Sequence, residues 1–305
     1  MKSEEFLGLI RRHLIKRGVS FDQTRAFSII ALPNIIKPTS RFFSPIYEIS
    51  KILTILDVSI KPMHARDPIA NCYINWNDVT KLKFDVPDYI QMSRRERGEN
   101  KQSISKGLFL NGELFDISKQ HIGGIYEKIF NENILINPEE YKKPYLIKSN
   151  LNAIHKSKVV NPSISLELPK KDQICSILIN NESDGFYIDH RVPIIRGTTG
   201  ACYIKTKERE ERFSNSAIKC TLDKLTNVMS NEEIKLVNSF CRELKMDYGN
   251  LDVLRDFDSG KLFIVDANKT PGGPPPALSP QDTFSALTHL AEAFYRRVVI
   301  PSFQY

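Results

Sequence analysis

The chain has 305 residues, of which 41% are hydrophobic and 26% are charged, and its formal net charge is +7 at pH 7. At this length and composition we expect a globular chain of two or three packed subdomains. No apolar run reaches the roughly 20 residues of a membrane span or the shorter core of a signal peptide. Five widely spaced cysteines without a CxxC pair argue against a disulfide framework or structural zinc.

These features predict a cytoplasmic protein with no membrane partner. The basic surplus is modest, and no long run of lysine and arginine is interleaved with aromatic residues. Such a positive surplus can bind a polyphosphate nucleotide as well as nucleic acid. We expect no nucleic-acid partner here. A homodimer stays open.

Apolar spacing and turn residues predict alternating helices and strands in the first hundred residues. Helices are expected at residues 3–17 and 43–56, and strands at residues 26–32, 58–60 and 72–76. The polar, charge-dense segment 93–105 is expected to be an exposed connection. We therefore place a boundary there, between an N-terminal α/β domain (1–100) and a second domain (101–305).

The remaining chain predicts helices and many antiparallel strands, the pattern of an α+β fold. We expect helices at residues 118–130, 231–244 and 281–299, and strands at residues 145–148, 159–160, 174–179, 185–195 and 201–207. The last two strands should pair with each other across a glycine-containing turn. A second hairpin should follow, connected to the last helix by a loop rich in proline and glycine.

The second hairpin carries the most informative polar residues. Two β-rich runs (NLDVLRDF and KLFIVDAN) flank a three-residue turn, and pairing centred on Ser259 places Asp252 opposite Asp266. Asn268 shares the face of Asp266 because side chains alternate along a strand. Opposed Cβ atoms lie about 4.5–5.5 Å apart, so the two carboxylates repel unless a cation lies between them. Two carboxylates and an amide oxygen predict a Mg²⁺ site, with a chance ion-pairing surface as the alternative.

With this hairpin, the chain resembles the ATP-grasp superfamily, and its motif style is similar to that of ligases that add glutamate to a ribosomal protein. The resemblance runs from about residue 116 to residue 276 and rests on the order of the motifs. In chain order these are Lys119, Lys148, the strand 174–179, Asp189-His190-Arg191, Lys205, Arg212-Phe213-Ser214-Asn215, Asp252-Val253-Leu254-Arg255, Asp266-Ala267-Asn268 and Pro271-Gly272.

The resemblance implies an ATP-grasp fold of two α+β subdomains that clamp ATP, preceded by a smaller N-terminal α/β domain. ATP and Mg²⁺ are the implied cofactors, and the implied metal ligands are Asp252, Asp266 and Asn268. The implied nucleotide-binding residues are Lys119, Lys148, Ile179, Asp189 and Asn215. The implied catalytic residues, which are cations set against the transferring phosphate, are Arg191, Lys205 and Arg212.

Three features depart from the family pattern. The second acidic metal ligand, usually Glu, is Asp266, whose side chain is one methylene shorter. The loop after Lys148 reads SNLNAIHKSKVV, so it lacks the glycines whose backbone N–H groups usually cradle phosphate. The first hundred residues carry no matching motif, and the resemblance leaves their role open.

Each predicted site residue also has a simpler interpretation as a surface or turn residue. Asp189 and Arg191 lie on the same face of their strand, because side chains alternate along it. In the simpler interpretation they take part in ordinary cross-strand ion pairs. His190 lies on the other face and is expected at the surface. The run 205–212 mixes charges and is by default a solvated hairpin end, except for its first and last residues.

The sequence points to an ATP-dependent ligase that joins a small-molecule carboxylate to an amine. ATP would phosphorylate the carboxylate, and the amine would attack the acyl-phosphate, so no nucleophilic side chain is needed. No GxxxxGK[ST] phosphate loop and no kinase HRD or DFG motif competes with this interpretation. Two alternatives stay open: a small-molecule kinase with the same fold, and a nucleotide-binding module without turnover.

Overall fold

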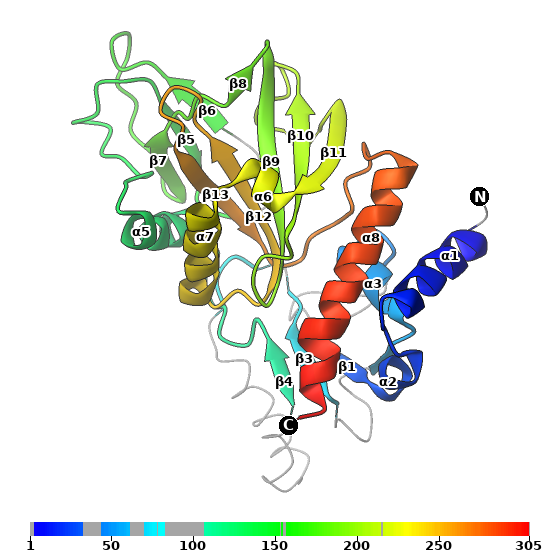
Figure 1. Ribbon diagram of the computed structural model, residues 1–305. Helices are drawn as coiled ribbons and strands as arrows, with labels where there is room; N and C mark the ends of the chain where they lie inside the picture. Colours follow the sequence, from blue (N-terminus) through cyan, green and yellow to red (C-terminus); the bar gives the residue numbers. More distant parts are fainter. Residues whose placement is uncertain are drawn as a thin grey trace, which may run out of the picture.

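The computed structural model describes residues 3–32, 44–61, 70–77, 79–82, 107–152, 154, 157–214 and 216–304. These residues form three β-sheets with helices packed on them, the α+β class that the sequence predicts (Figure 1). The expected connection at 93–105 and the candidate residue Asn215 lie outside the described residues. No helix within these ranges is both long and apolar enough to cross a membrane.

The N-terminal part is built on a parallel four-stranded sheet with the strand order β2-β1-β3-β4. Its strands are β1 (Ser28–Leu32), β2 (Ser59–Lys61), β3 (Cys72–Asn75) and β4 (Leu108–Leu110). The accompanying helices are α1 (Ser3–Lys16), α2 (Phe21–Ala26) and α3 (Glu48–Leu56). Every residue of β3 is buried, as is usual for a parallel strand covered on both faces.

The C-terminal helix closes the N-terminal core. Helix α8 (Pro280–Phe294) continues into the π-helical turn η3 (Tyr295–Val299) and the short helix α9 (Ile300–Ser302). Leu290 and Phe294 of α8 are buried in one cluster with Ile29 of β1 and Ile52 of α3, and Figure 1 places α8 beside α1 and α3. This core uses residues on both sides of the division expected near residue 100, and that division stays a prediction.

A small antiparallel sheet, β6-β5-β7, forms a separate layer. Its strands are β5 (Tyr145–Ser149), β6 (Ser157–Val160) and β7 (Gln173–Ile177). Tyr145 and Ile147 alternate with Leu146 and Lys148 along β5, so the first two enter a small apolar core with Cys175. Lys148 therefore projects from the other face of the sheet.

The largest sheet is antiparallel, with the order β11-β10-β9-β12-β13 and β8 paired to β9. Its strands are β8 (Glu182–Ser183), β9 (Phe186–Ile195), β10 (Ala201–Lys207), β11 (Lys219–Lys224), β12 (Tyr248–Arg255) and β13 (Leu262–Asn268). Val192 and Ile194 of β9 share an apolar core with helices α5 (Lys119–Phe130) and α7 (Asn231–Leu244). Because side chains alternate, Asp189 and Arg191 project from the opposite face.

The β12–β13 hairpin pairs Asp252 with Asp266, as the sequence predicts, but its register is not uniform. Arg255 pairs with Leu262 near the turn, a register that by itself sets Asp252 opposite Val265. A β-bulge next to Asp252 adds one residue on β13 and restores the predicted pair. The turn is longer than the three residues that we expected, and the bulge compensates for the difference.

Elements that the sequence analysis does not predict are short or depend on distant partners. They are α2, β4, β8, β11 and α6 (Leu225–Val228), with between 2 and 6 residues each. Helix α2 is held by its cap, where the Gln23 backbone N–H donates to the Ser20 hydroxyl at 3.3 Å. The expected closing helix is α-helical only to Phe294, after which the π-helical turn begins.

Candidate functional site

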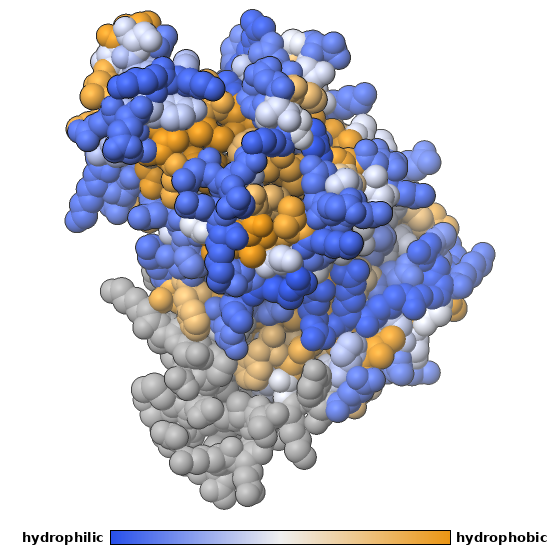
Figure 2. Space-filling view, turned by 60° about the vertical axis from the view of Figure 1, so that its left-hand side comes forward, coloured by the Kyte–Doolittle hydropathy of each residue, from blue (hydrophilic) through white to orange (hydrophobic). Residues whose placement is uncertain are grey.

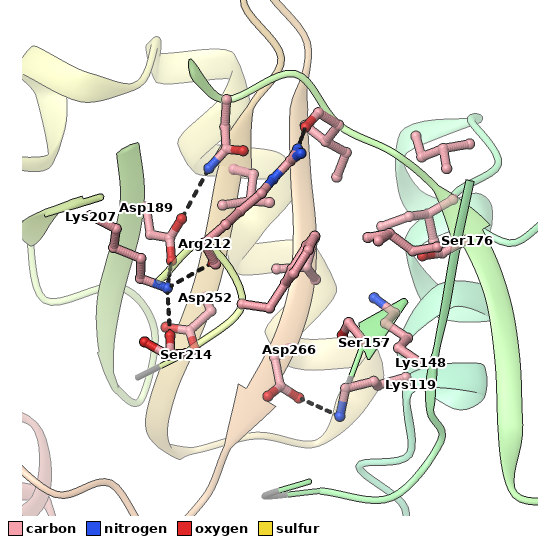
Figure 3. Close-up of a pocket in the computed structure, with 18 of the residues that line it drawn as sticks. Lys119, Lys148, Ser157, Ser176, Asp189, Lys207, Arg212, Ser214, Asp252 and Asp266 are labelled. Atoms are coloured by element: carbon pink, nitrogen blue, oxygen red, sulfur yellow. Dashed lines mark hydrogen bonds and ion pairs between the residues drawn. The ribbon is translucent and has the colours of Figure 1, made fainter. Parts of the chain in front are cut away.

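A pocket lies between the small sheet and the polar face of the six-stranded sheet. Its charged lining consists of Lys119, Lys148, Asp189, Lys205, Lys207, Arg212, Asp252 and Asp266 (Figure 3). Its apolar lining consists of Ile134, Leu146, Ile154, Ile177, Ile179, Phe213, Leu254 and Val265. Figure 2 shows apolar surface between hydrophilic protrusions in the upper part of the molecule. Apolar walls with converging charges suit a ligand that has one apolar and one anionic part.

Arg191 and Asp252 form a bidentate ion pair between neighbouring strands. Arg191 Nε donates to Asp252 Oδ1 at 2.7 Å, and Nη2 donates to Oδ2 at 3.0 Å. Burial alone would raise the pKa of Asp252, but the charge and hydrogen bonds of Arg191 outweigh burial and hold that pKa below its usual range. Arg191 therefore contacts the pocket through the carboxylate that it holds.

Two lysines and Asp266 form the opposite side of the pocket. Lys119 begins α5, and its backbone N–H donates to the Asn150 carbonyl just beyond β5, which brings it close to Lys148. Lys119 Nζ lies 3.8 Å from Asp266 Oδ1. Burial and the charge of Lys119 lower the pKa of Lys148, Asp266 opposes both, and the resulting pKa is about 8. With two cations and one carboxylate, this side has a surplus of positive charge that suits a phosphate group.

Lys207 is held near the far end of β10. It forms an ion pair with Asp189, and its Nζ donates to the Ser214 carbonyl at 2.8 Å. Asn181 Nδ2 donates to the other oxygen of the Asp189 carboxylate at 3.0 Å. Asp189 is thus fixed between two donors, and its charge offsets that of Lys207.

Arg212 and Lys205 present cations to the pocket in different ways. Arg212 donates to the Ile179 carbonyl at 2.7 Å, and its guanidinium lies 4.2 Å from the centre of the Tyr187 ring. Lys205 is 5% exposed and forms no ion pair with any residue in the described ranges. Burial lowers the pKa of Lys205, as does the charge of Arg191, whereas Asp252 opposes them.

The structure brings most of the predicted site residues together. Those that line the one pocket are Lys119, Lys148, Ile179, Asp189, Lys205, Arg212, Asp252 and Asp266. Arg191 joins them through Asp252, whereas Asn215 lies outside the described residues. Asn268 shares the strand face of Asp266, and its Oδ1 accepts the Thr270 backbone N–H at 2.9 Å. The roles of all these residues stay predictions.

Lys207 and Asn181 are polar residues of the pocket that the sequence analysis did not assign to the site, and one other residue was placed wrongly. Lys207, expected in a solvated hairpin end, is 4% exposed and lines the pocket with Asn181. Alternation along β10 puts Lys207 on the face of Lys205, so the sequence contains the signal for it. His190, expected at the surface, is buried because helices and neighbouring strands cover that face of the sheet.

The residues at the β12–β13 pair fit a hard divalent cation. Asp252 and Asp266 are direct cross-strand partners on one face, and Asn268 adds an amide oxygen on that face. No group of three or more His, Cys, Asp or Glu side chains is placed to hold a metal in the part of the chain that the structure describes. A metal at the Asp-Asp-Asn set would need further oxygens from a ligand or water, as Mg²⁺ at phosphate sites usually does.

A second polar cluster lies next to this row of residues. Glu48 of α3 is fully buried, and the Tyr248 hydroxyl donates to its Oε1 at 3.4 Å. Burial raises the pKa of Glu48 to about 7, although the charge of Arg191 opposes that effect. The hydroxyl of Tyr203 is also buried, without a hydrogen-bond partner among the described residues, and the buried Asn250 amide acts on the Glu48 carboxylate as a donor that lowers its pKa.

Glu48 should make the stability of the protein depend on pH. Its pKa is about 7 in the folded chain and 4.5 ordinarily, so the folded state holds the proton more tightly. The resulting stabilisation is complete below pH 4.5 and is lost as the pH rises through 7, a change of about 3 kcal/mol. The test is the free energy of unfolding in urea, measured at pH 5 and at pH 8. Between these pH values, Glu48→Gln should gain about 3 kcal/mol of stability relative to the unmodified chain. An equal difference at both pH values would contradict the prediction.

No protein-family model and no curated protein matches the sequence, but solved structures do. D-alanine–D-alanine ligase from Bacillus anthracis, complexed with ATP, is 12% identical, with a TM-score of 0.52 over 91% of this chain and 97% of that one. ATP-grasp ligase PsnB, complexed with a phosphomimetic variant of a minimal precursor, Mg and ADP, is 11% identical, with a TM-score of 0.51 over 91% and 99%. A RiPP-associated ATP-grasp ligase from Chryseobacterium gregarium, in complex with ADP and a leader and core peptide, is 12% identical, with a TM-score of 0.51 over 88% and 95%.

These similarities show that the chain has the ATP-grasp fold, and they confirm the fold predicted from the motifs. The pocket between the small sheet and the six-stranded sheet is thus a pocket between the two parts of that fold. At 11 or 12% identity the likeness extends to the fold alone, so the chemistry has to be argued from this chain's own residues.

Proposed function

We propose that the chain is an ATP-dependent ligase that joins a carboxylate to an amine and releases ADP and phosphate. One observation carries the proposal: Asp252 and Asp266 oppose each other in a pocket to which both facing sheets contribute cations. That arrangement suits a metal–polyphosphate ligand. The three similar proteins are ligases, and they are complexed with ATP or ADP, which supports a nucleotide as the ligand.

The pocket has a part for each end of ATP. Ile177, Ile179 and Leu254 form an apolar wall for the adenine, and Lys119 and Lys148 are placed to bind phosphate oxygens. When bound at Asp252, Asp266 and Asn268, Mg²⁺ supplies charge neutralisation for the phosphates. Lys205 projects from the same sheet face as these ligands and adds positive charge beside the transferring group.

The reaction needs no nucleophilic side chain. A carboxylate oxygen of the substrate attacks the γ-phosphorus, the bond from phosphorus to the oxygen of ADP breaks, and an acyl-phosphate forms. The amine nitrogen then attacks the acyl carbon, loses a proton, and expels inorganic phosphate. We assign Arg191 and Lys205 to the negative charge that develops on the phosphoryl group, because cations held in fixed positions lower the cost of that charge.

Product analysis separates this reaction from its alternatives. We would incubate the protein with Mg-ATP and paired panels of carboxylic acids and amines, including amino acids and short peptides, and measure ADP and phosphate. A ligase releases both in equal amounts, and only when an acid and an amine are both present. A kinase forms ADP with an alcohol and releases no phosphate. Absence of ADP formation over the whole panel, with binding of Mg-ATP intact, would leave a binding module.

Mg-ATP should raise the melting temperature of the protein, and Lys148→Ala should reduce this shift. A ligand at 100 times its Kd stabilises the folded state by about 2.7 kcal/mol. Loss of one buried, charge-assisted phosphate contact should weaken binding about tenfold or more. Lys158→Ala is the matched control, because Lys158 lies on β6 and forms an exposed ion pair with Glu167. Equal shifts in the two variants would remove Lys148 from the site.

A further inference from the structure

Glu48 brings a carboxylate from the N-terminal part of the chain to the six-stranded sheet. It is the first residue of α3, and its backbone N–H donates to the Pro271 carbonyl at 3.1 Å. Its Oε1 accepts the Tyr248 hydroxyl of β12. Glu48 is therefore held between α3, β12 and the loop that follows β13.

The other carboxylate oxygen of Glu48 has no close donor. The side chain is fully buried, and Oε2 is within strict hydrogen-bonding geometry of no residue that the structure describes. The neutral Asn250 amide is near enough to lower the pKa of Glu48 as a donor, and the Lys51 ammonium donates instead to the Gly273 carbonyl at 2.7 Å. A buried carboxylate oxygen without a close donor is costly, so it can accept a stronger one in another state of the protein.

Arg191 is the cation with the strongest effect on Glu48. Burial is the largest influence on the pKa of Glu48, and the charge of Arg191 is the largest influence that opposes burial. In this structure Arg191 donates to both oxygens of Asp252, at 2.7 and 3.0 Å. Arg191 thus acts electrostatically on two carboxylates and donates hydrogen bonds to only one of them.

Metal binding at Asp252 competes with this ion pair. A Mg²⁺ ion there takes carboxylate oxygens that now accept from Arg191, and the released guanidinium, still buried, needs another acceptor. We propose that Glu48 accepts the Arg191 guanidinium when Mg²⁺ binds Asp252, and so positions Arg191 beside the transferring phosphate. The proposal rests on the proposed function, and it gives the N-terminal part a direct role in the nucleotide site.

Glu48 is the group whose protonation controls this exchange near neutral pH. It is faced by Arg191 of β9, Tyr203 of β10, Tyr248 of β12 and, from its own helix, Lys51. Burial raises the pKa of both tyrosines well above the usual range, so they stay neutral, and burial lowers the pKa of Lys51. Because burial raises the pKa of Glu48 to about 7, acidification removes the acceptor for Arg191.

Calorimetry with ADP isolates the metal-dependent part of binding. The Kd for ADP is measured with saturating Mg²⁺ and again with EDTA, and the ratio of the two gives the contribution of the metal. In Glu48→Gln this ratio should fall about tenfold or more at pH 8, while the Kd in EDTA stays the same. Glu48→Asp should restore part of the ratio. Glu292→Gln is the control, because Glu292 of α8 forms ion pairs with Arg17 and Arg296 and does not line the pocket.

A second measurement varies the pH. Between pH 8 and pH 6 the ratio should fall in the unmodified protein and change less in Glu48→Gln, since the nucleotide and Lys148 titrate in both proteins. An unchanged ratio in Glu48→Gln, or the same pH dependence in both proteins, would overturn the proposal. If the unmodified protein binds ADP no better with Mg²⁺ than with EDTA, the proposed function itself fails.

Discussion

Asp266→Asn is expected to lose ATP turnover by about 10³-fold while the protein stays folded. The substitution keeps the shape of the side chain and removes one of the two charges that oppose each other across β12 and β13. Burial raises the pKa of Asp266 and the charge of Asp252 adds to that; the charges of Lys119 and Lys148 oppose both but leave the pKa raised, so the ionised carboxylate is disfavoured when no metal is present. The melting temperature without nucleotide should therefore be unchanged or higher in the variant.

The measurement is ADP release at saturating substrate, together with thermal melting in EDTA. Asp258→Asn is the matched control, because Asp258 lies at the exposed tip of the same hairpin and accepts from Asn180 Nδ2 at 3.0 Å. The control should keep full turnover. Turnover within tenfold of the unmodified protein in Asp266→Asn would contradict the assignment of Asp266 as a metal ligand.

Lys205→Met is expected to lower kcat by about 10²-fold or more, with a smaller change in affinity for Mg-ATP. Lys205 is buried, lies on the strand face of Asp189 and Tyr203, and forms no ion pair with described residues. A cation held in this way, with no structural partner to satisfy, stabilises charge that develops on a phosphoryl group. The methionine side chain keeps most of the buried length and removes the charge.

Lys205 gives a cleaner test than Arg191. Removing Arg191 leaves the partly buried carboxylate of Asp252 without its partner, which by itself lowers the stability of the protein. Lys205→Met leaves no such group, so its melting temperature should not fall. Lys219→Met, at an exposed position on the neighbouring β11, is the control. A rise in KM with kcat unchanged would assign Lys205 to ground-state binding, and no effect at all would remove it from the site.

The sequence predicts the pair at the centre of the site because local rules determine it. Alternation along a strand and hairpin pairing are enough to place Asp252 opposite Asp266 and to put Asp189 and Arg191 on one face. The β-bulge beside Asp252 could not be predicted. The longer turn shifts the register by one residue and the bulge shifts it back, so the pairing of Asp252 with Asp266 is the same as in a regular hairpin with a three-residue turn.

Residues that reach the site from distant parts of the chain could not be predicted. Glu48 lies 200 positions before its partner Tyr248, and nothing in the spacing of α3 indicates that its first residue is buried against β12. The strand β4 has three residues and gains its place in the sheet only by pairing with β3. Tertiary contacts of this kind override local pattern and propensity.

The packing of α8 and η3 on the N-terminal sheet affects the order in which the molecule can assemble. The hairpins of the six-stranded sheet join strands that are close in sequence and can form early. The core around Ile29 and Ile52 needs Leu290 and Phe294, so it stays open until synthesis has passed α8. Glu48 belongs to the part that is completed last. During translation, the nucleotide pocket therefore forms before the carboxylate that we assign to Arg191 is in place.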